Sequence, residues 1–348
     1  MAERSEIGAG ERMNGEIPWA YLRKGEWTIF SKEDSVKLEA AAKSGEPVVV
    51  DDGRLLVSVV DRTLTAVYWD EPSCPVVRAE WLLESSSGKF IPLSEAEAID
   101  INNLWTSLDP NEVHSFALHL HDHISGIETK KGETTIPAVQ KLNEIFAKCS
   151  PTASHRCKAI HHGYPNWTDV KRTMKHLVFV VHGIGETYCK KRLASGTIID
   201  QTLVLRQSTS TILDSHYPAG FENTIEFLPV DWSDVLGDMG DDLHARLNRI
   251  ALDSMPFVRQ ISNELLSDIL MYMARQDAVL AYVSKYMNVR YRLYRDNHPD
   301  FDGSISIMGH SLGSVISYDL LTVHCSELDF APNTFFAFGS PIGLFLAL

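Results

Sequence analysis

Apolar residues in the N-terminal part of the chain occur as short runs separated by turn signals. Ser31 opens a capping-box-like pattern, which predicts a helix that ends near Gly45. The β-branched runs at 48–50 and 55–60 flank a turn sequence at 51–53, so we expect a β-hairpin there. Together these elements predict a small α+β module, with its tryptophans in the core.

The C-terminal part has longer apolar segments, which predict a layered α/β fold. The run at 177–181 has no polar alternation, as in a strand buried on both faces. Further strands are expected at 224–230, 304–308 and 334–338. Two stripes at helical spacing predict helical faces that pack in the core: Leu243, Leu247 and Ile250, and then Ile261, Leu265, Leu266, Ile269, Leu270 and Met273. Strands that alternate with helices favour a mostly parallel sheet.

Length and composition set the domain organisation. The chain has 348 residues, 44% hydrophobic and 22% charged, which is typical of a globular protein with two domains. We expect a flexible lead at 1–16, the α+β module at 17–84, a connector with short helices at 85–175 and the α/β domain at 176–348. No run approaches the roughly 20 apolar residues of a membrane span, and the lead lacks the apolar core of a signal peptide. An intracellular protein is therefore predicted.

The charge pattern separates two kinds of partner. A net charge of −14 argues against nucleic acid, because binding to phosphates needs clustered basic residues. The exceptions are a basic stretch from Lys141 to His176 and the cluster Lys190, Lys191 and Arg192. One interpretation is that they attract an anionic headgroup or an acidic membrane surface. The other is a solvated basic face unrelated to substrate.

The cysteines favour reduced thiols over disulfides or metal. The five cysteines are odd in number and scattered, which suits a reducing compartment. Zinc ligands could come from Cys149, Cys157, His155, His161 and His162, but these residues contain no close pair of the usual spacing. We expect no metal and no cofactor.

Strand, turn and helix signals meet at Ser311. The strand expected at 304–308 runs into the sequence Gly309-His310-Ser311-Leu312-Gly313, and a helix is expected to follow. This is the context of a nucleophile elbow, a tight turn that raises a serine hydroxyl above the sheet edge. A side chain at either glycine would collide with the neighbouring strand or helix. We interpret Ser311 as a nucleophile, with Gly309, His310 and Gly313 forming its elbow.

A second glycine turn follows the strand at 177–181. Its sequence is His182-Gly183-Ile184-Gly185. An oxyanion hole in α/β-hydrolases takes one amide from the residue after the nucleophile and another from such a turn. We therefore predict that the backbone of Gly183, Ile184, Gly185 and Leu312 forms this hole. The alternative is a pair of unrelated glycine turns in a non-catalytic domain.

The rest of the triad is expected outside this sequence. In this fold an acid and then a histidine follow the serine along the chain. In a continuous helix after Ser311, the helical rise would put Asp319 about 12 Å and His324 about 20 Å away. Both are too far to act on the serine. The sequence thus predicts a partial, truncated α/β-hydrolase domain that is a fragment, an isoform or catalytically inactive.

Two resemblances add to this interpretation. Residues 17–84 resemble a WWE domain through Trp19, Trp27, Glu39, Arg78 and Trp81, which implies a module that binds a protein partner. From Thr224 onward the chain resembles the intracellular phospholipase A1 family named for its C-terminal DDHD domain, a domain that this sequence lacks. The matching segments lie at 226–232, 268–273, 297–301 and 309–313.

The second resemblance implies a function. Members of that family hydrolyse acyl esters of glycerophospholipids such as phosphatidic acid, as peripheral proteins on the cytosolic faces of Golgi, endoplasmic reticulum or mitochondrial membranes. A phospholipid substrate and a membrane surface are therefore the expected partners. Two rival functions stay open: a non-catalytic trafficking adaptor with a WWE-like interaction module, and a hydrolase of small soluble esters.

Overall fold

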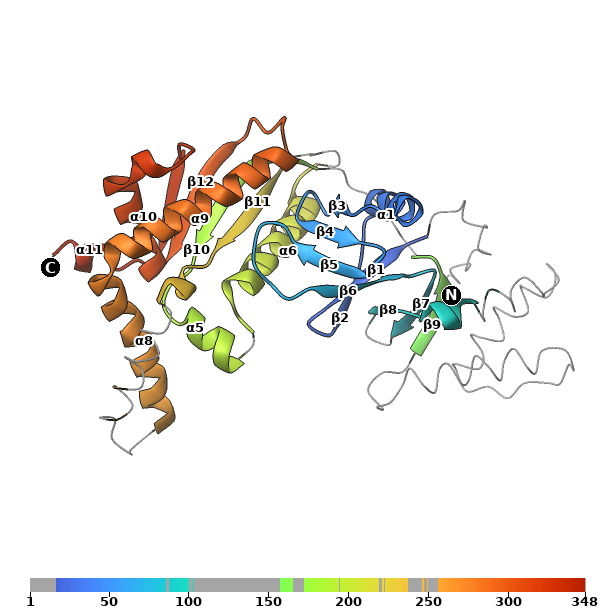
Figure 1. Ribbon diagram of the computed structural model, residues 1–348, viewed down its shortest axis with the longest axis horizontal. Coiled ribbons are helices and arrows are strands. Elements are labelled where there is room, and N and C mark those ends of the chain that lie inside the picture. The colour runs from blue at the N-terminus through green and yellow to red at the C-terminus, as the bar shows by residue number, and fades with distance from the viewer. Residues whose placement is uncertain are drawn as a thin grey trace, which may run out of the picture. The chain divides into compact units, whose positions relative to one another are not determined.

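The computed structural model describes residues 17–85, 88–99, 102, 157–164, 172–193, 195–218, 221, 223–236, 246, 249 and 256–347 (Figure 1). The chain forms two compact units, one of residues 1–67 and 71–170 and the other of residues 68–70 and 171–348. The predicted lead, the stripe of Leu243, Leu247 and Ile250, and most of the basic stretch from Lys141 to His176 lie outside the described residues.

The first unit contains a six-stranded antiparallel sheet and helix α1. The strand order is β2-β1-β6-β5-β4-β3. The elements are β1 (Trp19–Arg23), β2 (Glu26–Ile29), α1 (Lys32–Ser44), β3 (Val48–Val50), β4 (Leu55–Ser58), β5 (Thr63–Ala66) and β6 (Cys74–Arg78). The predicted helix is confirmed: the Ser31 hydroxyl accepts the amide hydrogen of Asp34, and Gly45 ends the helix in a left-handed conformation. The predicted hairpin is confirmed by the antiparallel pairing of β3 with β4.

A smaller sheet crosses the boundary predicted at residue 84. The strands β7 (Trp81–Ser85), β8 (Phe90–Pro92) and β9 (Cys157–His162) pair in the order β8-β7-β9. Local patterning did not predict β8 and β9. Strand β8 follows β7 closely along the chain, whereas β9 pairs with β7 from a distant part of it, which local patterning does not reveal. Buried Trp19 and Trp81 confirm that these tryptophans belong to the core.

The first unit brings together three of the residues that carry the WWE resemblance. The indole nitrogen of Trp19 donates to Oε1 of Glu39 at 2.8 Å, and Nε of Arg78 donates to the same oxygen at 2.8 Å. Glu39 therefore joins helix α1 to strands β1 and β6. Assignment of this unit as a WWE domain stays a prediction.

The second unit is built on a four-stranded parallel sheet. Its strands are β10 (Thr173–Val181), β11 (Asn223–Val230), β12 (Ser304–His310) and β13 (Thr334–Phe338), in the order β11-β10-β12-β13. Among the described residues, its helical elements include α5 (Glu186–Tyr188), a π-helical turn (Cys189–Leu193), α6 (Ile198–His216), α8 (Pro256–Ala274), α9 (Gln276–Asn297), α10 (Leu312–Val323) and α11 (Ile342–Phe345), with 3-10 turns at Ser233–Leu236 and Cys325–Glu327.

The predicted parallel α/β organisation is confirmed for this sheet. Residues 177–181 of β10 are buried on both faces, as the uninterrupted apolar run predicted. On one face, Val178 and Val180 pack with Ile198 of α6 and Phe227 of β11. Figure 1 shows α6 beside β11 and α10 beside β12.

The predicted core stripe of α8 is wrong at three positions. The side chains of Leu266, Leu270 and Met273 are 49%, 43% and 57% exposed. Helix α8 instead buries the adjoining face with Ser267, Asp268, Met271 and Tyr272. The physical reason is that polar side chains on this face make hydrogen bonds within the second unit. Asp268 accepts a hydrogen bond from the Gly185 amide, and the Tyr272 hydroxyl donates one to Asp319.

Candidate active site

The two glycine turns lie side by side at one edge of the parallel sheet. Val181, the last residue of β10, is paired with Gly309 of β12, so both strands deliver their following residues to the same place. The chain winds from β10 outward to β11, and then returns to the other side of β10 for β12 and β13. The point between β10 and β12 is thus a topological switch point, where α/β proteins form ligand sites at the carboxyl ends of strands.

Ser311 has the backbone conformation of a sharp strand-to-helix turn. Its dihedral angles are φ 51° and ψ −123°, which a residue with a side chain rarely adopts. Three surrounding contacts hold it: its amide donates to the Phe338 carbonyl at 3.0 Å, and its carbonyl accepts the amide of Ser314 at 3.0 Å and the hydroxyl of Ser314 at 2.5 Å. Such strain persists only where neighbours enforce it.

The two elbow glycines are required by close backbone packing. A Cβ on Gly309 would lie 2.6 Å from Cα of Ser314. A Cβ on Gly313 would lie 2.3 Å from the carbonyl oxygen of His182. The second distance also shows that the start of α10 rests against the turn that follows β10.

Gly183 is the point at which the two turns touch. A Cβ on Gly183 would lie 2.8 Å from Cβ of Ser311 and 2.9 Å from the carbonyl oxygen of His310. Gly183 and Ile184 lie beyond the last paired residue of β10. Leu312 begins helix α10, so its N–H has no acceptor within the helix. Backbone amides from both turns are therefore available beside the serine.

A buried carboxylate anchors the first turn from helix α8. Oδ2 of Asp268 accepts the Gly185 amide hydrogen at 2.7 Å, and Asp268 is 4% exposed. Gly185 itself has φ 92°, a left-handed conformation that favours glycine. The turn is thus fixed by its sequence and by a contact with a residue 83 positions away.

His182 and Trp232 anchor the same turn from the opposite end. The rings stack with centroids 4.9 Å apart, and the indole nitrogen of Trp232 donates to the His182 carbonyl at 2.9 Å. The Trp232 amide donates to Nε2 of His182 at 3.1 Å. Nε2 therefore carries no proton, so we assign a neutral ring whose Nδ1 donates to the Gly183 carbonyl at 2.7 Å.

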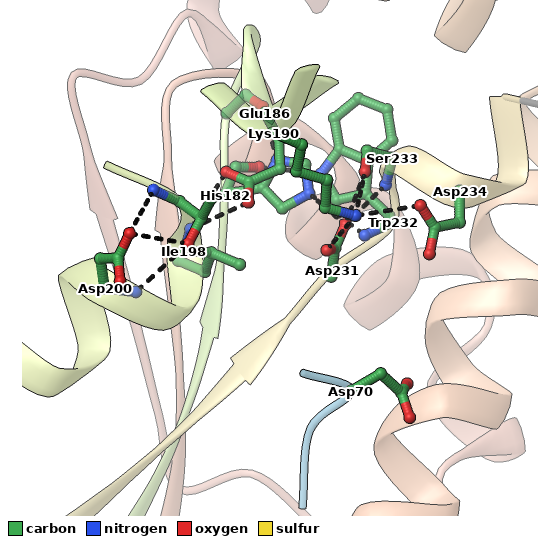
Figure 2. Close-up of polar contacts among 12 residues, drawn as sticks. Asp70, His182, Glu186, Lys190, Ile198, Asp200, Asp231, Trp232, Ser233 and Asp234 are labelled. Atoms are coloured by element: carbon green, nitrogen blue, oxygen red, sulfur yellow. Dashed lines mark hydrogen bonds and ion pairs between the residues drawn. The ribbon is translucent and has the colours of Figure 1, made fainter. Parts of the chain in front are cut away.

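Figure 2 shows the charged cluster beside this pair. Nζ of Lys190 lies 2.5 Å from Oδ2 of Asp231 and 2.9 Å from both Oδ1 of Asp234 and the Ser233 hydroxyl. Burial opposes ionisation of Asp231, but contacts with His182 and Lys190 hold its pKa well below the usual range. Oδ1 of Asp231 lies 3.4 Å from Nε2 of His182, and this contact is an ion pair only if the imidazole ring is protonated. Because we assign a neutral ring, we attribute the low pKa to Lys190.

A second buried carboxylate supports helix α6. Both oxygens of Glu186 accept the Ile198 amide hydrogen, at 2.9 and 3.1 Å. Burial is the largest influence on Glu186 and raises its pKa above 4.5, although the Ile198 amide and nearby positive charge oppose that shift. Thr197 and Asp200 complete the helix start with a capping box.

The basic cluster predicted for headgroup binding is divided. Lys190 is engaged by Asp231 and Asp234, whereas Lys191 is exposed. The side chain of Arg192 lies outside the described part of the chain. A headgroup role for these three residues stays a prediction.

Asp319 and His324, an acid and a histidine that follow Ser311 in sequence, have partners other than the Ser311 hydroxyl. Asp319 accepts from Tyr272 and Gln276, and His324 pairs with Glu327. Among the described residues, no histidine or carboxylate hydrogen-bonds to Ser311 Oγ, and His182 uses both ring nitrogens elsewhere.

Sequence reasoning missed Asp268, Asp231 and Trp232 as parts of this site. All three lie in segments that carried the family resemblance, at 226–232 and 268–273. That coincidence was the one available signal, because their contacts join elements far apart in sequence. No metal-binding group of three or more ligands occurs among the described residues, and no helix in that part of the chain has the length and apolar character of a membrane span. Cys149 and His155, considered above for zinc, lie outside that part.

The fold and site define a mixed α/β protein whose parallel sheet is compatible with a hydrolase core. The sequence is also similar to three curated proteins from Homo sapiens. Triacylglycerol hydrolase DDHD2 is 31% identical over 92% of this chain and 47% of its own length. Phospholipase DDHD1 is 30% identical over 80% of this chain and 33% of its own length. SEC23-interacting protein is 29% identical over 87% of this chain and 32% of its own length.

The chain is thus a homologue of the DDHD-family phospholipases, at about 30% identity over most of its length. This confirms the family resemblance seen in the sequence. The chain spans about half the length of the first of these relatives, and a third of the others. No family model and no solved structure matches it.

Proposed function

We propose that this chain supplies the nucleophile and oxyanion-binding turn of a phospholipase A1-type enzyme, which hydrolyses acyl esters of glycerophospholipids such as phosphatidic acid. The observation that carries the proposal is the contact of two turns: Ser311, strained at φ 51°, faces Gly183 across a gap that excludes a Cβ. The names of two relatives, a phospholipase and a triacylglycerol hydrolase, support a lipid ester as substrate.

In the proposed reaction, Oγ of Ser311 attacks the ester carbonyl while a general base takes its proton. The carbonyl oxygen becomes an oxyanion that accepts hydrogen bonds from the amide of Leu312 and from the glycine turn that follows β10. Collapse expels the glycerol oxygen, which takes a proton and leaves as a lysophospholipid. Water then hydrolyses the acyl-serine and releases the fatty acid.

Fluorophosphonate labelling of the full-length protein tests the nucleophile. We expect covalent labelling at Ser311 and its loss in Ser311→Ala. Absence of labelling in the folded wild-type protein would favour the rival adaptor function, which the name of the SEC23-interacting relative supports.

Substrate class is tested by comparing soluble short-chain esters with aggregated phospholipid. A phospholipase is expected to prefer the aggregated lipid, whereas a small-ester hydrolase shows no preference. Binding to anionic vesicles at low salt tests the proposed headgroup-binding surface: reversal of charge at Lys191 and Arg192 should weaken vesicle binding.

We further propose peripheral association with cytosolic faces of Golgi, endoplasmic reticulum or mitochondrial membranes, and a protein partner for residues 17–84.

A further inference from the structure

The Gly185 amide, one of the three in the first turn, already has a strong acceptor. Oδ2 of Asp268 receives its hydrogen at 2.7 Å in a buried setting. A hydrogen bond from an amide to a carboxylate is roughly twice as strong as one between neutral groups. The Gly185 N–H therefore points toward α8 and is not available to a substrate oxygen beside Ser311.

We propose that Asp268 is a positioning residue, which holds the Gly183–Gly185 turn so that the amides of Ile184 and Leu312, without that of Gly185, receive the oxyanion. This inference rests on the proposed function and narrows its site. Asp268 contacts the turn through the Gly185 amide. It acts through the orientation of the peptide between Ile184 and Gly185.

The geometry of the turn explains why one anchor at Gly185 matters. The other end is fixed by the Nδ1 contact of His182 with the Gly183 carbonyl and by the indole of Trp232. Gly185 has a left-handed conformation and no side chain, so the peptide before it can rotate once its acceptor is removed. With Asp268 in place, both ends of a three-residue turn are held and the Ile184 amide lies between them.

The expected magnitude follows from the chemistry of oxyanion holes. Removal of one donor typically lowers kcat by about 100-fold to 1000-fold. Loss of Asp268 leaves the donor present but mobile, so we expect a smaller loss in Asp268→Ala, about 10-fold to 100-fold in kcat. KM should change by less than about twofold, because the oxyanion contact strengthens only in the transition state.

The conservative variant separates positioning from a need for charge. Asp268→Asn keeps an oxygen that can accept the Gly185 amide. We expect it to regain most of the activity, to within about fivefold of the wild-type kcat, since neutral acceptors are weaker but remain directional. Glu226→Gln is the matched control: Glu226 is also a buried carboxylate of the second unit, 1% exposed, but it accepts a hydrogen bond from Arg206 of α6 and lies on β11 opposite Leu177, in the middle of β10. It should lower stability and leave kcat unchanged.

The test measures kcat and KM with a lipid ester, fluorophosphonate labelling rate and hydrogen exchange of the Gly185 amide in the full-length protein. Support is a lower kcat and slower labelling in Asp268→Ala, rescue in Asp268→Asn and faster exchange at Gly185 in the alanine variant. If the wild type is labelled and Asp268→Ala is folded with unchanged kcat and labelling, if Asp268→Asn loses as much kcat as Asp268→Ala, or if Glu226→Gln lowers kcat equally, the positioning role is overturned. If the wild type is not labelled at all, the proposed function itself fails.

Discussion

Gly183 and Ser311 are in such close contact that no side chain fits between them: a Cβ on Gly183 would lie 2.8 Å from that of Ser311. The two residues are 128 positions apart, at the ends of strands that pair side by side. Their contact joins the two turns that sequence motifs identified separately.

Gly183→Ala is therefore expected to displace the elbow. The new methyl group would also lie 2.9 Å from the His310 carbonyl, so backbone has to move, at a cost of about 1–3 kcal/mol in unfolding free energy. A shift of about 1 Å at Ser311 would slow fluorophosphonate labelling by about 100-fold. The control is Gly343→Ala, where a Cβ has no neighbour within 4 Å. Equal labelling of both variants contradicts the contact.

Glu186→Gln should change how stability depends on pH. Burial raises the pKa of Glu186 above 4.5, so its ionised form is disfavoured in the folded state. A group with a raised folded pKa contributes stability below its unfolded pKa and loses it as pH rises through the folded pKa. The glutamine retains an acceptor for the Ile198 amide without titrating. In urea unfolding from pH 4 to 8, the unfolding free energy of the variant should increase relative to that of the wild type as pH rises. The prediction is refuted if the two free energies depend on pH in the same way.

Lys190→Met should destabilise the second unit, because Asp231 would lose its positive partner while 13% exposed. We expect a loss of about 1–3 kcal/mol at pH 7, less than for a fully buried pair since Lys190 is partly exposed. The low folded pKa of Asp231 means that this stabilisation is present above pH 3.8 and is lost as pH falls below it. Lys191→Met, at an exposed neighbour, should change stability by less than about 0.5 kcal/mol. Similar losses in both variants would argue against the pairing.

Glu39→Ala tests the polar centre of the first unit. Removal of the carboxylate leaves the Trp19 indole N–H without its acceptor in a residue that is 1% exposed, so we expect a loss of about 1–3 kcal/mol. Glu33→Ala is the control on the same helix, since its ion pair with Lys37 is largely exposed and worth about 0.5 kcal/mol or less. Unfolding followed by tryptophan fluorescence measures both. An unchanged midpoint in Glu39→Ala would contradict the role of this hydrogen bond.

The sequence by itself determined the local elements of both units. Apolar runs placed the strands at 177–181, 224–230 and 334–338, and Ser31 with Gly45 placed the ends of the first helix. These signals are local: β-branched and aromatic residues favour strands, the uninterrupted run at 177–181 reflects burial on both faces, and helix ends need a cap and a left-handed residue. The homology to DDHD-family phospholipases was likewise visible in short segments.

Only the tertiary structure decided which groups meet. Strand order brought Gly183 to Ser311, and helix α8 turned Asp268 inward while Leu266 and Leu270 stayed exposed, against the stripe that the sequence predicted. It also paired Lys190 with Asp231. The physical reason is that hydrophobic periodicity records how apolar a face is and not what lies opposite it, whereas a hydrogen bond between residues 83 positions apart depends on the packing of the whole unit.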